Sequence, residues 1–224
     1  MTYYMFSGVV IAPHRKRNML HLPIKEKEMI IERMLPRKLR GFTLTEAAIV
    51  LGIVGLILGA IWVAAAAVYN NLRVSTTSNQ LLQIAQSVRS IHAASTVVDP
   101  NITALMVAQA GGMPRDMVAD TDGDGAVDTV SDVWGGTVTV DAAAIDGVAN
   151  AGFTVTFANV PQGACSDLLV RNTGQGGRDS GLRQAGIAGA LADIPNTGIS
   201  ISTATSACVS ATNNTIGFTF ALRS

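Results

Sequence analysis

The chain is poor in aromatic and charged residues, which form 5% and 14% of its 224 residues. Its four lysines all lie before residue 39, and His92 is the one histidine after residue 21. A catalytic nucleophile needs a nearby base, and a nucleic-acid-binding surface needs clustered basic charge. We find no nucleotide-binding loop and no zinc-ligand spacing in the sequence. The part of the chain after residue 41 is therefore predicted not to be an enzyme and not to bind nucleic acid directly.

Charge is almost absent from the stretch between Arg40 and Arg73, where Glu46 is the single charged residue. The apolar run from Ala47 to Asn71 is long enough to span a bilayer, because about 20 apolar residues cover its hydrocarbon core. A lone carboxylate near the start of such a run costs several kcal/mol unless a positive group pairs with it. Cutting the chain after Gly41 would create an α-amino group that could be this partner.

Residues 1–41 form a basic segment with nine Lys and Arg and three acidic residues, a net charge of +6. The positive-inside rule predicts that this segment stays in the cytoplasm. An ordinary secretory signal is cut after its apolar stretch, whereas this cut precedes the apolar run and leaves it in the product. The product from residue 42 has a net charge of −6. Met29 or Met34 could be the start of a shorter leader.

The stretch Arg40-Gly41-Phe42-Thr43-Leu44-Thr45-Glu46, with the apolar run after it, resembles the prepilin signature of type IV pilins and type II secretion pseudopilins. The resemblance covers Pro36 to about Ser95. It implies that a prepilin peptidase cuts between Gly41 and Phe42 and that the new Phe42 amine is methylated. It also implies that Glu46 pairs with the Phe42 amine of a neighbouring subunit. The alternative is a plain signal anchor in which Glu46 occurs by chance.

The helix is predicted to continue past the membrane, because residues 42–94 contain no proline. Residues 42–71 form the transmembrane or filament-core half, and residues 72–95 form an amphipathic half. The amphipathic face is expected to comprise Leu81, Leu82, Ile84, Ala85, Val88, Ile91 and His92, with Gln80, Gln83, Gln86 and Arg89 between them. We expect His92 to be a packing residue. The glycines of the apolar half either allow close helix approach or only loosen the helix. Many type IV pilins carry a proline in the second half of this membrane segment. Residues 63–68 contain none, so this segment is more similar to those of the type IVb branch.

Residues 96–224 are predicted to form a globular head. Alternation of apolar and polar residues predicts strands at 136–140, 153–157 and 216–220, each with one apolar face. Short helices are expected at 101–110, capped by Asn101, and at 161–172, and residues 174–181 read as a flexible glycine-rich loop. The amphipathic half of the long helix is the natural cover for the sheet. The fold class is thus α+β, a long N-terminal helix packed on an antiparallel sheet, as in the pilin ladle fold.

The two cysteines, Cys165 and Cys208, both lie in the predicted head. The head is expected outside the cytoplasm, where a disulfide is the default state. The resemblance agrees, because a C-terminal disulfide-bounded region is typical of type IV pilins. The tract from Asp132 to Val140, followed by these cysteines, resembles type IVb pilins of the thin conjugative and bundle-forming kind. Two free buried thiols are the alternative.

An acidic tract could bind a metal. Asp120, Asp122, Asp124 and Asp128 match the first half of a calcium loop, in which oxygen ligands alternate around a glycine turn. The EF-hand pattern fails at its twelfth position, which is Ser131 rather than Glu. No cofactor is required by this interpretation, and calcium is a candidate ligand. The alternative is a solvated acidic turn.

The sequence thus predicts the structural subunit, or major pilin, of a type IVb-like pilus. The resemblance implies partners: further copies of the chain in a helical filament, the prepilin peptidase, the inner-membrane assembly machinery, and the membrane before assembly. The precursor would reside in the inner membrane and the product in the cell-surface pilus. Alternatives are a minor pilin or pseudopilin, a membrane-anchored calcium-dependent binding module, and an enzyme on a signal anchor. Adhesion, aggregation, motility and conjugative contact all remain open as roles.

Overall fold

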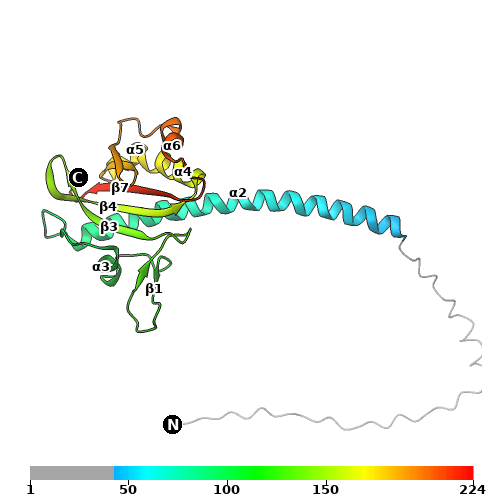
Figure 1. Cartoon of the computed structure of the whole chain (residues 1–224), viewed down its shortest axis with the longest axis horizontal. Coiled ribbons are helices and arrows are strands. Elements are labelled where there is room, and N and C mark those ends of the chain that lie inside the picture. Colours follow the sequence, from blue (N-terminus) through cyan, green and yellow to red (C-terminus); the bar gives the residue numbers. More distant parts are fainter. Residues whose placement is uncertain (1–42, 224) are drawn as a thin grey trace, which may run out of the picture. The chain divides into compact units, whose positions relative to one another are not determined.

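A computed structural model describes residues 43–223, apart from the side chains of residues 175 and 176. Its first described element is the helix α2, Leu44–Ile91 (Figure 1). The predicted helix is confirmed, although it ends three residues before Ala94. Glu46 lies in its first turn. Gly41 and Phe42, which carry the predicted cleavage site, lie outside the described residues.

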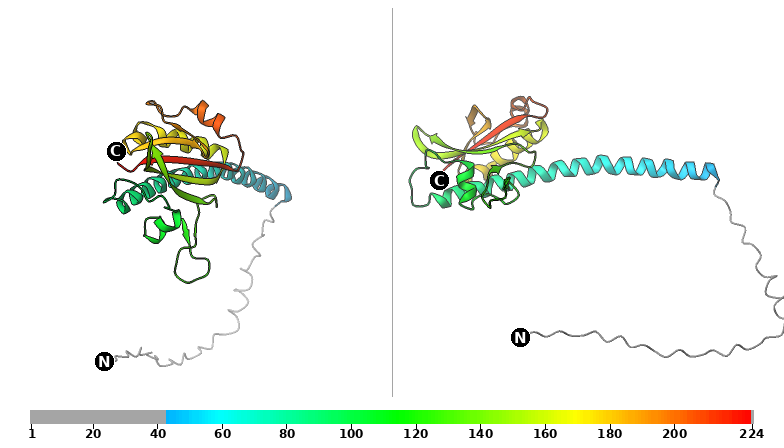
Figure 2. Two further views of the ribbon diagram at one scale, coloured as in Figure 1. Left: turned by 60° about the vertical axis from the view of Figure 1, so that its left-hand side comes forward. Right: turned by 60° about the horizontal axis from the view of Figure 1, so that its bottom comes forward.

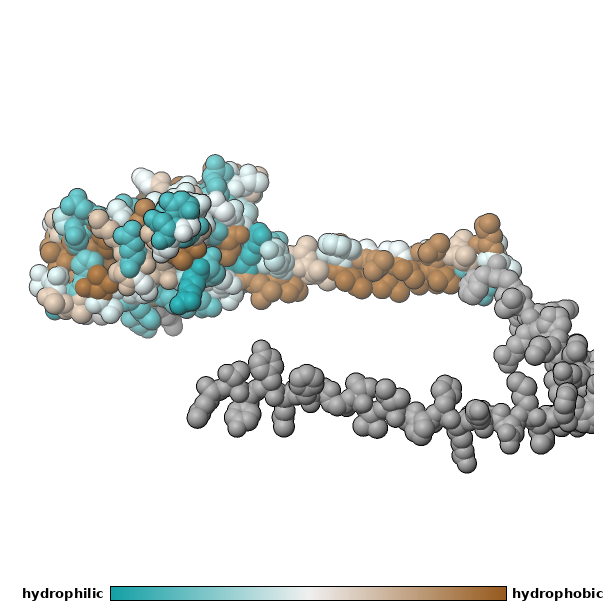
Figure 3. Space-filling model, turned by 90° about the horizontal axis from the view of Figure 1, so that it is seen from below, coloured by the Kyte–Doolittle hydropathy of each residue, from teal (hydrophilic) through white to brown (hydrophobic). Residues whose placement is uncertain are grey.

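The chain divides into two compact units, residues 1–55 and residues 56–224. The described part of the first unit consists of Thr43 and the first turns of α2, whose side chains are almost all exposed. The second unit contains the rest of α2 and every other described element. Its helical residues before Arg73 also present large apolar side chains at their surface (Figure 3).

The head is built on a five-stranded antiparallel sheet in the order β3-β4-β7-β5-β6. The strands are β3 Val138–Ile145, β4 Val148–Val160, β5 Leu182–Ile187, β6 Ala190–Asp193 and β7 Asn214–Ala221. Val155 of β4 lies opposite Phe218 of β7, which fixes the register of the central pair. All three predicted strands are confirmed and are longer than predicted, although the first begins at Val138 rather than at residue 136. The hairpin of β5 and β6 is an addition that the sequence analysis did not predict.

Short elements surround the sheet. They are α3 Ala104–Gln109, β1 Val118–Ala119, β2 Thr129–Val130, α4 Gln162–Thr173, α5 Gln175–Asp179 and α6 Ile201–Ala207. The predicted cap of the first of these helices was wrong. Thr103 caps α3, because its hydroxyl accepts the Met106 N–H. The predicted loop at 174–181 was also wrong in part, since it contains the single turn of α5. The helix at 161–172 is confirmed as α4.

One face of the sheet carries the core. The apolar faces of β4 and β7 are at most 1% exposed and comprise Phe153, Val155, Phe157, Ile216, Phe218 and Phe220. The part of α2 after Arg73 runs along the sheet in three views (Figures 1 and 2). Its side chains Leu81, Ile84 and Val88 belong to the same core cluster, as do Leu168 and Leu169 of α4. The α+β architecture with a helix covering an antiparallel sheet is therefore confirmed.

Several positions on α2 differ from the predicted helix face, among them Ile91, which is exposed rather than packed. Leu82 is exposed, whereas Gln80 is buried and donates from Nε2 to Asp116 Oδ2 at 2.6 Å. Arg89 donates to the Ala221 carbonyl oxygen from Nε and Nη2, at 3.1 and 2.9 Å. These hydrogen bonds attach the helix to the loop before β1 and to the end of β7. A helical periodicity of apolar residues gives no sign of such long-range polar contacts.

Candidate functional site

The exposed carboxylate of Glu46 lies in the first turn of α2. The Thr43 hydroxyl accepts the Glu46 N–H at 3.3 Å, so Thr43-Leu44-Thr45-Glu46 fits the capping-box pattern. A negative charge in a first turn also complements the helix dipole. Glu46 therefore has a local structural explanation beside the predicted pairing with the Phe42 amine. That pairing stays a prediction, because Phe42 lies outside the described residues.

The apolar surface of α2 follows directly after Glu46. Leu56 and Trp62 are each 76% exposed, and no residue in the most apolar 18-residue window of α2 is buried. Within residues 43–223, α2 is the one helix long and apolar enough to cross a membrane. This surface has no partner within residues 43–223, so we expect it to pack against lipid or other apolar helices.

Tyr69 and Arg73 end this apolar surface. Arg73 donates from Nη2 to the Tyr69 hydroxyl at 2.9 Å, and its guanidinium lies 4.4 Å from the centre of the tyrosine ring. Tyrosine and arginine are both typical of the membrane–water interface. The sequence analysis did not identify this pair. The sequence does contain a signal for it, which is the four-residue spacing of Tyr69 and Arg73. Residues four apart on a helix are neighbours on its surface.

The head contains the predicted disulfide. Cys165 in α4 bonds to Cys208, which follows α6, with a Cα–Cα distance of 6.0 Å. Both cysteines are fully buried. The bond closes a chain segment that contains α5, β5, β6 and α6. The alternative of two free thiols is thereby excluded.

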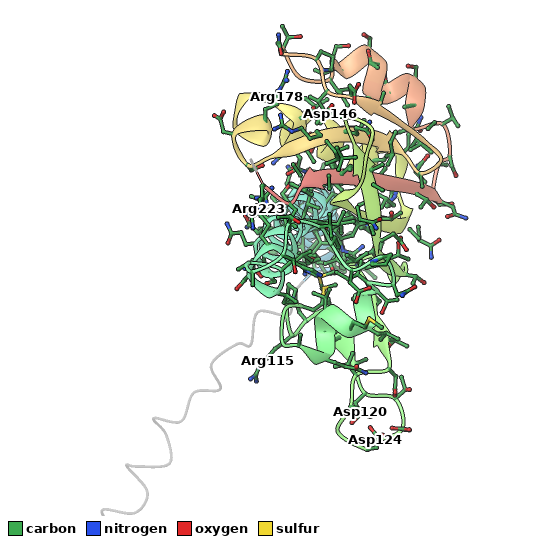
Figure 4. The ribbon with its side chains drawn as sticks, turned by 90° about the vertical axis from the view of Figure 1, so that its left-hand side faces the viewer. Arg115, Asp120, Asp124, Asp146, Arg178 and Arg223 are labelled. Carbon is green, nitrogen blue, oxygen red and sulfur yellow. A yellow bond between two sulfur atoms is a disulfide. The ribbon has the colours of Figure 1, made fainter. Side chains whose placement is uncertain are left out.

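The acidic loop between β1 and β2 protrudes from the head, with Asp120 and Asp124 near its tip (Figure 4). Asp120, Asp122 and Asp124 each offer an oxygen, and these atoms lie within 4.8 Å of one another. Asp128 stands apart from this group, because its Oδ2 accepts the N–H and the hydroxyl of Thr121, at 2.7 and 2.6 Å. The calcium ligands thus remain a prediction, with three of the four carboxylates brought together.

Hydrogen bonds inside the loop offer a second account of its sequence. The Asp120 carboxylate accepts the N–H groups of Gly123 and Gly125 at 2.6 and 2.8 Å, and these bonds hold its pKa below the ordinary value. Hydrogen bonds from Thr121 lower the pKa of Asp128 in the same way. Aspartates that bind their own backbone are typical of turns without a metal.

Asp132 begins the Asp-Val-Trp-Gly-Gly turn before β3 and is 7% exposed. Its Oδ1 accepts the N–H groups of Trp134 and Gly136, both at 2.8 Å. Its Oδ2 has no hydrogen-bond partner among the described residues. Burial raises the pKa of this carboxyl, against the lowering effect of its hydrogen bonds to backbone N–H groups. A Cβ at Gly136 would lie 1.9 Å from the Ala158 carbonyl oxygen, which explains glycine at that position.

His92 lies at the end of α2 and is half-buried. Its Nδ1 lies 2.9 Å from the Val88 carbonyl oxygen, and its Nε2 accepts the Asp99 N–H at 3.2 Å. These two contacts require the tautomer protonated on Nδ1. The side chain therefore holds the loop after α2 against the helix, in keeping with a structural residue.

Comparison with known proteins places the head in a family. The PilS N-terminal profile matches residues 71–221. A crystal structure of type IV b pilin from Salmonella typhi is similar in fold, with a TM-score of 0.50 and 23% identity over 66% of this chain and 99% of that one. An NMR structure of type IVb pilin (PilS) from Salmonella typhi is 20% identical, with a TM-score of 0.33 over 70% and 96% of the two chains. No curated protein matches the chain. Because the PilS profile covers well over half of its residues, the chain belongs to the PilS family of type IVb pilins.

Proposed function

We propose that this chain is the major structural subunit of a type IVb pilus. In this proposal the precursor resides in the inner membrane with residues 1–41 in the cytoplasm. A prepilin peptidase removes that leader after Gly41. Assembly machinery in the inner membrane then moves the product from the bilayer into a surface filament of identical subunits.

The observation that carries the proposal is the contrast between the exposed apolar part of α2 and the buried part that follows it. Leu56 and Trp62 are exposed where Ile84 and Val88 are wholly buried. An apolar helix is stable in lipid before assembly, and it is equally stable among identical helices in a filament core. The same surface thus serves both locations, which supports a subunit that is stored in the membrane and then polymerised.

Glu46 gives the proposal its sharpest test, because glutamine can keep the capping box while removing the charge. We expect Glu46→Gln and Glu46→Ala both to be cleaved normally and both to be missing from filaments. The measurement is the amount of each variant in sheared surface material and in membranes. A defect confined to Glu46→Ala would assign Glu46 to helix capping. Normal filaments from both variants would show that pairing with the Phe42 amine does not set the register.

A second candidate function is a calcium-dependent binding module anchored in the membrane. The observation that favours it is the close approach of the Asp120, Asp122 and Asp124 oxygens. Such a module would stay in the membrane as separate chains, whereas a major pilin would be the main protein of the sheared fraction. A minor pilin would occur in that fraction at a small share of the total.

A further inference from the structure

The head contains a polar cavity of about 340 Å³ that none of the roles above uses. It lies between the β3–β4 turn, α5 and the β5–β6 hairpin, and its charged side chains are Asp146, Arg178, Arg183 and Asp193. Asp146 and Arg178 lie together at one end of the head, away from Asp120 and Asp124 at the other end (Figure 4). The cavity is therefore separate from the acidic loop.

The cavity has guanidinium donors without acidic partners. Arg178 donates from Nη1 to the Ile194 carbonyl oxygen and to Asn196 Oδ1, which fixes the orientation of its guanidinium. The Nε of Arg183 is buried and has no hydrogen-bond partner within residues 43–223. The ion pair found among those residues joins Arg171 and Asp167, so neither cavity arginine is paired with a carboxylate. Arg183 also lines the cavity, so its guanidinium group is placed beside any ligand that enters it.

Two carboxylates, those of Asp146 and Asp193, also line the cavity. Gln184 donates from Nε2 to Asp193 Oδ1 at 2.9 Å, which orients that carboxylate and leaves Oδ2 available. Asp146 has a φ of 51° and Gly147 a φ of 80°, so the two form the tight turn between β3 and β4. The two aspartates balance the charge of the two arginines. A simple anion is therefore not drawn in by net charge, and a suitable ligand must offer both a carboxylate and hydrogen-bond donors.

We propose that this cavity binds a sugar acid. Its carboxylate would accept hydrogen bonds from the guanidinium groups of Arg178 and Arg183, since guanidinium matches the geometry of a carboxylate. Its hydroxyl groups would donate to Asp146 and Asp193. The volume of the cavity suits one sugar ring, at the small end of the range of about 300–1,000 Å³ for ligand pockets. The proposal concerns the head and does not depend on filament assembly.

The test is a titration of the full chain with D-glucuronate, D-glucose and acetate, followed by nuclear magnetic resonance. A polyoxyethylene detergent is needed, because detergents with sugar head groups would compete. We expect D-glucuronate to bind at least about fivefold more tightly than D-glucose or acetate, because it alone satisfies both donors and acceptors. Acetate that binds as tightly as D-glucuronate, or D-glucuronate that binds no better than D-glucose, would overturn the proposal.

Two lysine variants test the geometry, since lysine keeps the charge but cannot bind a carboxylate through two parallel hydrogen bonds. Arg183→Lys and Arg178→Lys are each expected to weaken D-glucuronate binding at least about fivefold. Arg171→Gln is the control, because it removes a guanidinium from the outer surface of α4 and should leave binding unchanged. The two substitutions are independent, so Arg178→Lys provides the result if Arg183→Lys does not fold. Unchanged binding in a folded lysine variant contradicts the assignment.

Discussion

The two parts of α2 belong to one helix, and their surroundings are opposite. Residues 44–72 present large apolar side chains all around the helix, and residues 73–91 bury one face in the core of the head. Both parts contain weak helix formers, glycine and β-branched residues in the first and serine and threonine in the second, so helix propensity does not explain the difference. The two parts differ in where each finds an apolar surface to pack against. The later part finds its partner in the same chain, whereas the earlier part needs lipid or other copies of the chain.

The largest effect is expected from the disulfide, which belongs entirely to the head. The Cys208→Ser variant should lose about 4 kcal/mol of unfolding free energy, because the bond closes a loop of about 42 residues in the unfolded chain. Thermal unfolding in detergent micelles measures this loss. Reduction of the unmodified chain should give the same shift. An unchanged melting temperature in both cases would mean that the disulfide does not stabilise the head.

A matched pair of isoleucines tests the comparison itself. Ile84 is 0% exposed and Ile57 is 51% exposed on the same helix. Ile84→Ala should cost about 2–5 kcal/mol of unfolding free energy, because it leaves a cavity in the core. Ile57→Ala should cost less than about 0.5 kcal/mol in the same thermal unfolding measurement. Equal losses from the two substitutions would contradict the division of α2 into two parts.

Asp132 should make head stability depend on pH in the direction opposite to most aspartates. Burial raises its folded-state pKa above the unfolded value, so the folded state binds the proton more tightly. Stability from this group is therefore fully present below the unfolded pKa and is lost as the pH rises through the folded pKa. The D132N chain lacks this loss, so its stability relative to the unmodified chain should increase with pH. Urea unfolding between pH 3 and pH 7 tests the sign, and a difference that falls with pH contradicts it.

The smallest effect concerns the acidic loop. If calcium binds there, it should raise the melting temperature of the head, and removal by a chelator should reverse the rise. Asp122→Asn and Asp124→Asn should each abolish the response, while Asp141→Asn on β3 serves as a control. A melting temperature that changes with neither calcium nor chelator would leave the loop as a hydrogen-bonded turn.

Much of this fold could be predicted because its signals are local. The alternation in β4 and β7 identified the core strands, and the charge-free run with its amphipathic continuation identified α2. The hairpin of β5 and β6 was missed because Ala185, Gly186 and Ala190 give little apolar contrast. The strand identity of β5 depends on pairing with β7, which is a contact between distant parts of the chain, and β6 in turn pairs with β5.

The candidate sites, too, could be predicted only where their signals are local in the sequence. Glu46 was identified because a lone charge in an apolar run is visible in the sequence, and the disulfide because the chain has two cysteines. The cavity of Arg178 and Arg183 could not be found in this way. Asp146 comes from the β3–β4 turn, far along the chain from both arginines, and the fold alone brings them together.

The central claim is that the chain is cut after Gly41 and assembled through the apolar part of α2. The most direct test is the intact mass of the protein recovered from sheared surface material and from membranes. The account predicts a product that begins at Phe42, heavier by one methyl group and lighter by the two hydrogens of the disulfide, mainly in the sheared material. An uncut chain confined to membranes would contradict it.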